Sequence, residues 1–245
     1  MKRFTLFEFR KSILYEDDDL IVCHKPSGLA VQNANPGVTD LESLARTYLK
    51  GGYVGLVHRL DQPVEGLVLM AKTPLAAGEL STQLRNGQMV KEYQAVVTAE
   101  IDAFAGRSEN GGEETFLESF LVWDPRTHCA AQVPEERKGA KKARLAYRIL
   151  KKRQDVIPDE LCLLLAVRLF TGRHHQIRVQ LAAAGLPILG DRKYGKAFPG
   201  MNQEMGLCAT SLCATHPVTG RLLHWECQPL GRSFLLFQDK AVDEE

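Results

Sequence analysis

The chain has 245 residues, of which 44% are hydrophobic and 25% are charged, and its formal net charge is +1. These values are typical of a soluble globular protein that buries a substantial core. No apolar run approaches the roughly 20 residues of a membrane-spanning helix. The N-terminus also lacks the apolar segment of a signal peptide, so we expect a cytoplasmic protein without a membrane partner.

The first half of the chain predicts short strands and two capped helices. The run 13–25 indicates two strands around an acidic turn, and Pro26-Ser-Gly28 ends the second strand. Thr39-Asp40 caps a helix that extends to about residue 49. The apolar runs 54–57 and 67–72 predict two buried strands with a polar turn between them.

The remaining elements follow the same mixed pattern. Thr73 as N-cap and Pro74 as first helical residue begin a helix that ends at Arg85. Further expectations, in chain order, are a strand at 89–101, a loop at 102–114, a strand at 160–170 and a helix at about 173–184. Because there is no steady βαβ rhythm, we predict an α+β fold. Its mixed, largely antiparallel sheet is flanked by helices, with a cleft across the sheet.

Basic residues are concentrated in one stretch. The segment 137–153 contains nine lysines and arginines and no acidic residue. Such a stretch can follow a phosphate backbone, or it can simply face solvent. Charge alone leaves both interpretations open. Lys141 and Lys142 are the candidates for contact with a nucleic acid.

The six cysteines are scattered and include no Cys-x-x-Cys pair. Cys208 and Cys213 are five residues apart, but no second pair follows that would complete a zinc site. We therefore expect six reduced, packed thiols and no metal.

The turn between the two central apolar runs has the sequence His58-Arg59-Leu60-Asp61. A turn held by two strands can aim Asp61 with little freedom, as a catalytic carboxylate requires. The competing interpretation is an aspartate that only hydrogen-bonds to its own backbone, which is the usual role of an isolated turn aspartate.

A second polar corner lies at residues 170–181. Gly172 permits a tight strand-to-helix turn, and Arg173 then lies near a helix N-terminus, a position that suits a phosphate or a carboxylate. The adjacent His174 and His175 do not indicate a shared metal ion, because successive residues on a helix point about 100° apart.

Five segments of this chain, taken together and in order, resemble the RluA-type pseudouridine synthases. They are the Lys-Pro-x-Gly element at 25–28, the His-Arg-Leu-Asp motif at 58–61 with Gly66-Leu67 and Ala71-Lys72, the Lys-x-Tyr-x-Ala-x-Val strand at 91–97, the Gly-Arg-x-His-Gln-Ile-Arg motif at 172–178 with its continuation to Gly195, and the His-Pro-x-Thr-Gly turn at 216–220.

The chain departs from the family pattern at two places. Val64-Glu65 stands where the family usually has Thr-Ser, and His174 stands where Thr or Ser is usual. Both places flank the expected active centre, so they bear on substrate choice more than on reaction type. The resemblance covers a single catalytic domain, residues 1–245 with a core at about 13–230. We expect no N-terminal S4-type RNA-binding domain.

The resemblance implies the isomerisation of specific uridines in structured RNA to pseudouridine, without a cofactor or metal. Asp61 is then the catalytic carboxylate, Arg173 the guanidinium that keeps it charged and oriented, and Tyr93 the ring that packs against the target base. By its pattern alone, Tyr93 on an alternating strand is also explained as a core residue.

The resemblance also implies an RNA stem-loop of ribosomal or transfer RNA as the partner. We expect no obligatory protein partner and a monomer. Arg59 matches the residue that fills the space left by the extruded base. The candidate RNA-binding residues are Arg59, His58, Lys72, Lys91, His175, Arg178, Lys141 and Lys142. For Lys72, Lys91 and Arg178, structural pairing is an equal alternative.

Two other functions compete with the synthase. The first is a catalytically idle RNA-binding protein on the same fold, which the altered Val64-Glu65 makes plausible. The second is a hydrolase that uses Asp61 and Glu65 as paired carboxylates.

Overall fold

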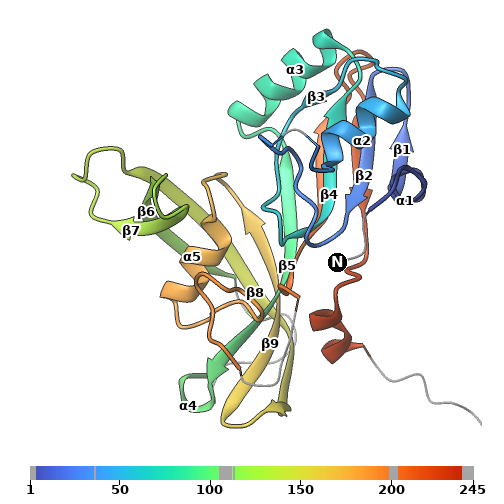
Figure 1. The fold of residues 1–245 in the computed structure, drawn as a ribbon. Helices are drawn as coiled ribbons and strands as arrows, with labels where there is room; N and C mark the ends of the chain where they lie inside the picture. Colours follow the sequence, from blue (N-terminus) through green and yellow to red (C-terminus); the bar gives the residue numbers. More distant parts are fainter. Residues whose placement is uncertain (1–3, 36, 105–111, 113, 199–203, 239–245) are drawn as a thin grey trace, which may run out of the picture. The chain divides into compact units, whose positions relative to one another are not determined.

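The structure, a computed structural model, describes residues 4–35, 37–104, 112, 114–198 and 204–238 (Figure 1). The chain divides into two compact units. The first contains Met1–Tyr93, Arg168–Phe170 and Cys208–Pro229, and the second contains Gln94–Val167, Thr171–Leu207 and Leu230–Glu245. Across the described ranges, no helix has both the length and the apolar character that crossing a bilayer requires.

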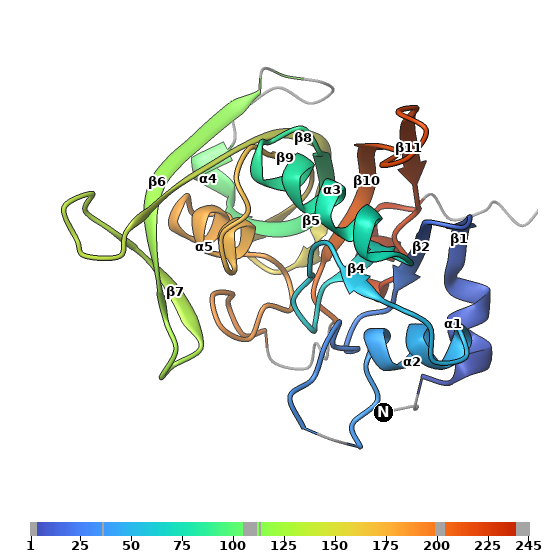
Figure 2. The ribbon, with the colours of Figure 1, turned by 90° about the horizontal axis from the view of Figure 1, so that it is seen from above.

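The first unit is built on a mixed sheet with the strand order β1-β2-β4-β10 (Figure 2). β3 pairs with β4, and β11 pairs with β10. All of these pairs are antiparallel except β4 with β10, which run parallel. The strands are β1 (Ile13–Glu16), β2 (Leu20–Lys25), β3 (Gly55–Leu56), β4 (Glu65–Ala71), β10 (Leu207–Thr215) and β11 (Leu222–Glu226).

Three helices cover this sheet. α1 (Leu6–Ser12) packs on β2 and on α2 (Leu41–Tyr48), and α3 (Pro74–Arg85) packs on β3 and β4 (Figure 2). Each helix begins at a side-chain cap, namely Thr5, Asp40 and Thr73, whose oxygens accept backbone N–H groups of the first turn. All seven residues of β4 are buried, as expected for a central strand covered on both faces.

Gly66 allows the parallel strands β4 and β10 to approach each other closely. Its φ is +115°, and a Cβ placed on it would lie 2.3 Å from the carbonyl oxygen of Ala209 and 2.5 Å from the nitrogen of that residue. Both the backbone conformation and the space therefore require glycine at this position.

We expect Gly66→Ala to reduce the free energy of unfolding by about 2–4 kcal/mol, because the methyl group clashes with rigid backbone and the positive φ is strained. Urea unfolding measures the change. Gly78→Ala is the matched control: Gly78 lies inside α3 with open space around it, so the same added methyl should stabilise by about 0.5–1 kcal/mol. Equal stability of Gly66→Ala and the parent would contradict the close approach.

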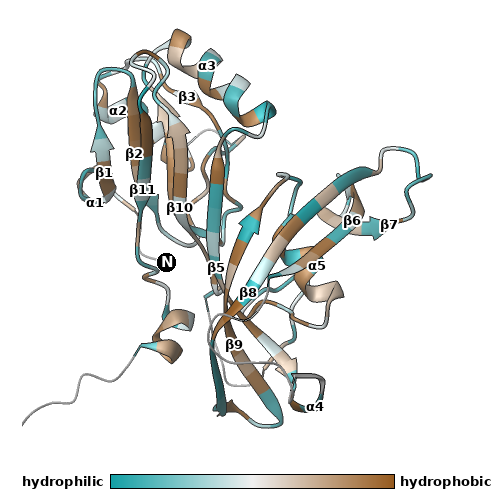
Figure 3. Ribbon diagram, turned by 180° about the vertical axis from the view of Figure 1, so that it is seen from behind, coloured by the Kyte–Doolittle hydropathy of each residue, from teal (hydrophilic) through white to brown (hydrophobic). Residues whose placement is uncertain are grey.

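The second unit has the strand order β5-β9-β8-β6-β7, and β6 pairs antiparallel with both β7 and β8. Its elements are β5 (Val90–Glu100, which enters this unit after Tyr93), α4 (Ile101–Phe104), β6 (Thr115–Asp124), β7 (Cys129–Val133), β8 (Lys141–Ile157), β9 (Glu160–Leu169), α5 (Gln176–Ala183) and the 3-10 helix η1 (Arg232–Phe237). β9 is a nearly continuous apolar strand, and most of it is therefore brown in Figure 3.

α5 is anchored by a buried polar side chain. The amide nitrogen of Gln180 donates to the hydroxyl of Ser119 at 3.0 Å and to the carbonyl of Ala143 at 3.2 Å. These bonds connect the helix to β6 and β8. The helix therefore has a fixed position relative to the basic strand β8.

The predicted fold class is confirmed: the protein is α+β with a mixed, largely antiparallel sheet. Three local predictions need correction. The apolar run 54–57 contributes only the two-residue strand β3, since most of it approaches the turn as irregular backbone. α5 begins at Gln176 rather than Arg173, because His175 has a φ of +52° that no helix accepts. α1 was not predicted, although Thr5 and Glu8 form a capping box before it. Most of the predicted loop 102–114 lies outside the described residues.

Candidate active site

The turn that carries Asp61 is fastened to the segment 25–28 by hydrogen bonds. The amide of Gly28 donates to the carbonyl of Gln62 at 2.9 Å, and the side chain of Gln62 donates back to the carbonyl of Gly28 at 3.0 Å. The hydroxyl of Ser27 donates to the carbonyl of Pro63 at 2.8 Å. The backbone carbonyl of Asp61 accepts a hydrogen bond from the amide of Val64 at 3.0 Å. The carboxylate therefore projects from a braced turn rather than from a free loop.

Lys25 is a buried cation beside the turn that carries Asp61, and the sequence pattern indicated no role of its own for it. Its side chain is fully buried, at 0% exposure, and its ammonium donates to the carbonyls of Pro26, Leu29 and Gln62 at 3.0, 2.7 and 3.1 Å. Three acceptors match the three donors of an ammonium group. Burial lowers the pKa of Lys25 to about 7, while the charge of Asp61 opposes this shift. Lys25 thus holds the turn and places positive charge near Asp61.

Tyr93 lies at the start of β5 in the same unit as Asp61 and is 7% exposed. Burial raises the pKa of Tyr93, and the negative charge of Asp61 raises it further. The phenol therefore keeps its proton at neutral pH and can donate a hydrogen bond. The structure brings Tyr93 and Lys25 each within electrostatic range of Asp61.

Arg173 lies in the second unit, just before α5, and is exposed. Its Nε donates to the carbonyl of Lys142 at 2.9 Å, and its amide donates to Oε1 of Gln176 at 3.0 Å. The side-chain bond uses Nε, and the Arg173 side chain remains exposed to solvent. Its expected pairing with Asp61 stays a prediction.

The two adjacent histidines of this corner pack on Trp123. The ring of His174 stacks on Trp123 with centroids 4.7 Å apart, and the ring of His175 meets it edge to face at 5.1 Å. Nδ1 of His175 also lies 2.7 Å from the hydroxyl of Tyr194. His174 therefore has a packing role here, and His175 is held by aromatic neighbours and one hydrogen bond.

Among the candidate RNA-binding residues of the first unit, only Arg59 is exposed. Nε2 of His58 accepts the amide of Leu69 at 3.1 Å, and burial, with a smaller contribution from Lys91, lowers the pKa of His58 to about 3. A neutral imidazole bound to the backbone is not a phosphate contact, so the structure favours a structural role for His58.

The two lysine candidates of this unit are partly buried. The ammonium of Lys72 lies 2.7 Å from a carboxylate oxygen of Glu16. Burial lowers the pKa of Lys91. The ion pair of Lys72 matches the structural alternative stated for it.

Arg178 is not on an RNA-accessible surface. Its Nε and its terminal nitrogen donate to the two carboxylate oxygens of Asp191, both at 2.7 Å. The side chains are 4% and 0% exposed. The ion pair matches the structural alternative stated for Arg178: the pair is buried and bidentate, because this position on α5 faces the second unit's interior.

The basic stretch serves two purposes. Lys141, Lys142 and Arg144 are exposed at the start of β8, where Lys142 lies 2.7 Å from Glu118 in an exposed ion pair. At the other end, Lys151 and Arg153 donate to the carbonyls of Phe237 and Leu236 at 3.0 and 2.6 Å. The second pair therefore holds η1, whereas the basic side chains at the start of β8 face solvent.

Glu65 is buried, and one of its carboxylate oxygens lies 3.4 Å from Nε2 of His24. A carboxylate committed to a buried neighbour is a poor partner for Asp61 in hydrolysis, so the structure gives the hydrolase alternative no support.

Two side-chain groups in the described residues have the composition of metal ligands: Asp17 with Asp19 and His216, and His24 with Cys208 and Cys227. In the first group, the carboxylate of Asp17 already accepts the hydroxyl of Tyr15 at 2.5 Å, the amide of Leu20 at 2.7 Å and a ring nitrogen of His216 at 3.0 Å. Its lone pairs are used internally, so it is a structural cluster.

Comparison with known proteins identifies the family. A family model described as RNA pseudouridylate synthase matches residues 19–183. The chain is 32% identical over 241 residues to ribosomal large subunit pseudouridine synthase D of Haemophilus influenzae, covering 91% of this chain and 68% of that protein. It is also 32% identical over 216 residues to the dual-specificity RNA pseudouridine synthase RluA of the same organism, covering 86% and 90%.

The fold agrees with these matches. The solved structure of human RNA pseudouridylate synthase domain containing 4 superposes with a TM-score of 0.69 at 23% identity, covering 94% of this chain and 92% of that one. With the motifs at Asp61 and Arg173 and the braced turn already described, these findings show that the chain belongs to the RluA-type family of RNA pseudouridine synthases.

Proposed function

We propose that this enzyme converts specific uridines in ribosomal or transfer RNA stem-loops to pseudouridine, with Asp61 as the catalytic carboxylate and Tyr93 and Arg173 as its partners. The braced turn is the observation that carries the proposal, because it fixes Asp61 beside a protonated phenol and a buried ammonium. One relative is named for ribosomal RNA and another for dual specificity toward RNA. The substrate test should therefore include ribosomal RNA and at least one other class of RNA. We further propose that the enzyme acts in the cytoplasm as a monomer that needs no protein partner.

The reaction breaks the N1–C1′ bond of the uridine, turns the base and joins C5 to C1′; C5 then loses its proton and N1 gains one, so the product is an isomer of the substrate. No electrons enter or leave, so the chain's own groups suffice. The target base must leave its stack, which costs a few kcal/mol in a paired region. Arg59, exposed on the catalytic turn, can fill the space and contact phosphates. Tyr93 then offers an apolar ring and a hydroxyl to the uracil.

The first test is tritium release from RNA transcribed with [5-³H]uridine, with large-subunit ribosomal RNA and transfer RNA assayed in separate reactions. Release from either pool supports the proposal and identifies the substrate class. RNA binding without release from any pool, including total cellular RNA, would favour the idle RNA-binding protein.

The exposed start of β8 is the proposed RNA-gripping surface. We expect Lys141→Glu/Lys142→Glu to weaken RNA binding and to reduce the slope of log affinity against log salt concentration by about 1–2, because two phosphate contacts are lost. Filter binding over a salt series measures both effects. Two charge reversals at the exposed Lys11 and Lys50, outside the basic stretch, control for net charge. An unchanged salt slope in the β8 variant would remove this surface from the RNA-binding site.

A further inference from the structure

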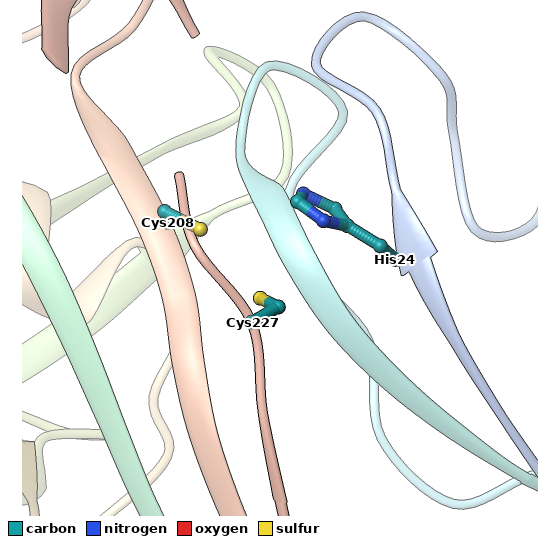
Figure 4. A group of neighbouring side chains, drawn as sticks. All are labelled: His24, Cys208 and Cys227. Atoms are coloured by element: carbon teal, nitrogen blue, oxygen red, sulfur yellow. The ribbon is translucent and has the colours of Figure 1, made fainter. Parts of the chain in front are cut away.

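Four side chains that can bind a metal ion lie in the first unit, next to the residues assigned to the chemistry above. His24 comes from β2, Glu65 from the first position of β4, Cys208 from β10, and Cys227 from the segment after β11. Nε2 or Nδ1 of His24 and the Sγ atoms of the two cysteines all lie within 4.8 Å of one another. Figure 4 shows the imidazole directed from β2 toward the two sulfurs.

Strand register explains why these residues converge. Cys208 and Glu65 are direct partners in the parallel pair, so their side chains lie on the same face. His24 is the partner of Leu67, which shares that face with Glu65 because the two residues are two positions apart on β4. The amide of Cys227 donates to the carbonyl of Thr210 at 2.9 Å, which brings its sulfur alongside β10.

The group is buried and incompletely hydrogen-bonded. The side chain of His24 is 10% exposed, and its fully buried Nε2 makes no hydrogen bond to any residue that the structure describes. The nearest carboxylate oxygen, from Glu65, is 3.4 Å away. A buried ring nitrogen without a hydrogen bond is costly and calls for a ligand or a function.

We propose that His24, Cys208, Cys227 and Glu65 form a binding site for a zinc-type divalent ion. In a tetrahedral zinc site with bonds of about 2.3 Å to sulfur and 2.0 Å to nitrogen, neighbouring ligand atoms are about 3.5–3.8 Å apart. The upper limit of 4.8 Å among the ligand atoms of His24, Cys208 and Cys227 therefore requires only small side-chain shifts, while Glu65 lies outside that limit and has one oxygen 3.4 Å from Nε2 of His24. Two thiolates and one imidazole select zinc over magnesium or calcium, and the carboxylate of Glu65, beside His24, becomes the fourth donor after it moves toward the sulfurs.

The site has a structural consequence for the enzyme. Each cysteine releases its thiol proton on binding, and the ion joins β2, β4, β10 and the segment after β11. β4 follows directly on the turn that carries Asp61, and Lys25 follows His24. The ion therefore braces both segments that hold the catalytic turn. The donor Glu65 is supplied by one of the two departures from the family pattern.

The test is metal analysis of the full chain, expressed with zinc in the medium, carrying no histidine tag and purified without chelators. We expect about one zinc per chain by elemental analysis, and thiolate-to-cobalt charge-transfer absorption after exchange with Co²⁺. Cys227→Ser and His24→Asn should lose this absorption or weaken cobalt binding at least about tenfold. Cys213→Ser is the matched control, since Cys213 lies on the same strand β10 outside the group.

Three results would overturn the proposal. The first is a zinc content well below one equivalent per chain together with no cobalt absorption. The second is a loss of cobalt binding in Cys213→Ser equal to that in Cys227→Ser. The third is a disulfide between Cys208 and Cys227, found by thiol titration of protein purified without reductant. If Cys227→Ser or His24→Asn does not fold, Glu65→Gln keeps both sulfurs and the imidazole and should still weaken cobalt binding. Because no RNA is present, these outcomes are independent of the proposed substrate and of Asp61.

Discussion

Replacing Asp61 by asparagine is expected to abolish tritium release, with kcat reduced by at least about 10⁴-fold. Asparagine has nearly the same shape but no negative charge, so it removes the catalytic group and leaves the turn. The bonds that brace the turn use the backbone of Gln62 and Pro63 and the side chains of Ser27 and Lys25. Folding and RNA affinity should therefore remain close to those of the parent protein.

The measurement is single-turnover release from [5-³H]uridine RNA, with filter binding on the same preparation. Asp18→Asn provides the matched control, because Asp18 is an exposed acid of the same unit on the turn between β1 and β2. It should retain full activity. Activity in Asp61→Asn within tenfold of the parent would mean that another group performs the chemistry. A loss of RNA binding equal to the loss of rate would instead make Asp61 a binding residue.

The elements that sequence predicted well are those specified by local signals. Thr73, Pro74 and Arg85 mark both ends of α3 correctly, and Asp40 caps α2 as expected. The start of α5 was misplaced because the helix signals at Gly172 and Arg173 precede a left-handed residue, His175. In that conformation its ring contacts Trp123 and Tyr194, which are distant in sequence and belong to no local pattern.

The site was predictable only in part for the same physical reason. Asp61 stands out because a charged turn between two apolar runs is visible in a single segment. The role of Lys25 depends on carbonyls of Leu29 and Gln62, and Gln62 is 37 positions away. Cys208 and Cys227 were expected to be inert thiols because their spacing matches no zinc motif. They meet His24 only through strand pairing, which composition and spacing do not reveal.

The second large effect concerns stability and is expected at Asp191. Asp191→Asn should reduce the free energy of unfolding by about 3–5 kcal/mol, because it leaves the guanidinium of Arg178 buried without a counter-charge. Asp191 also accepts the amide of Lys193 at 2.9 Å, so the change loosens the turn that follows α5. Urea unfolding at pH 7 measures the loss.

The same pair predicts how stability depends on pH. Burial acts to raise the pKa of Asp191, but the hydrogen bonds and charge of Arg178 outweigh it and lower the pKa below the ordinary value. A carboxyl whose pKa is lower in the folded state binds fewer protons there than in the unfolded state. Its contribution is therefore complete above about pH 4 and is lost as the pH falls through the folded-state pKa. The parent protein should show this acid-induced decline, and Asp191→Asn should lack that part of it.

A double-mutant cycle separates the pair from its surroundings. Arg178→Met alone leaves a buried carboxylate and should destabilise to a similar extent, whereas Arg178→Met/Asp191→Leu removes both charges and should recover much of the loss. Additive losses of unfolding free energy in the double variant would show that the two side chains act independently. If the double variant folds and its RNA affinity is unchanged, the role of Arg178 is purely structural. A specific loss of RNA binding in that folded variant would restore Arg178 to the RNA-contacting residues, because packing alone would then not account for its position.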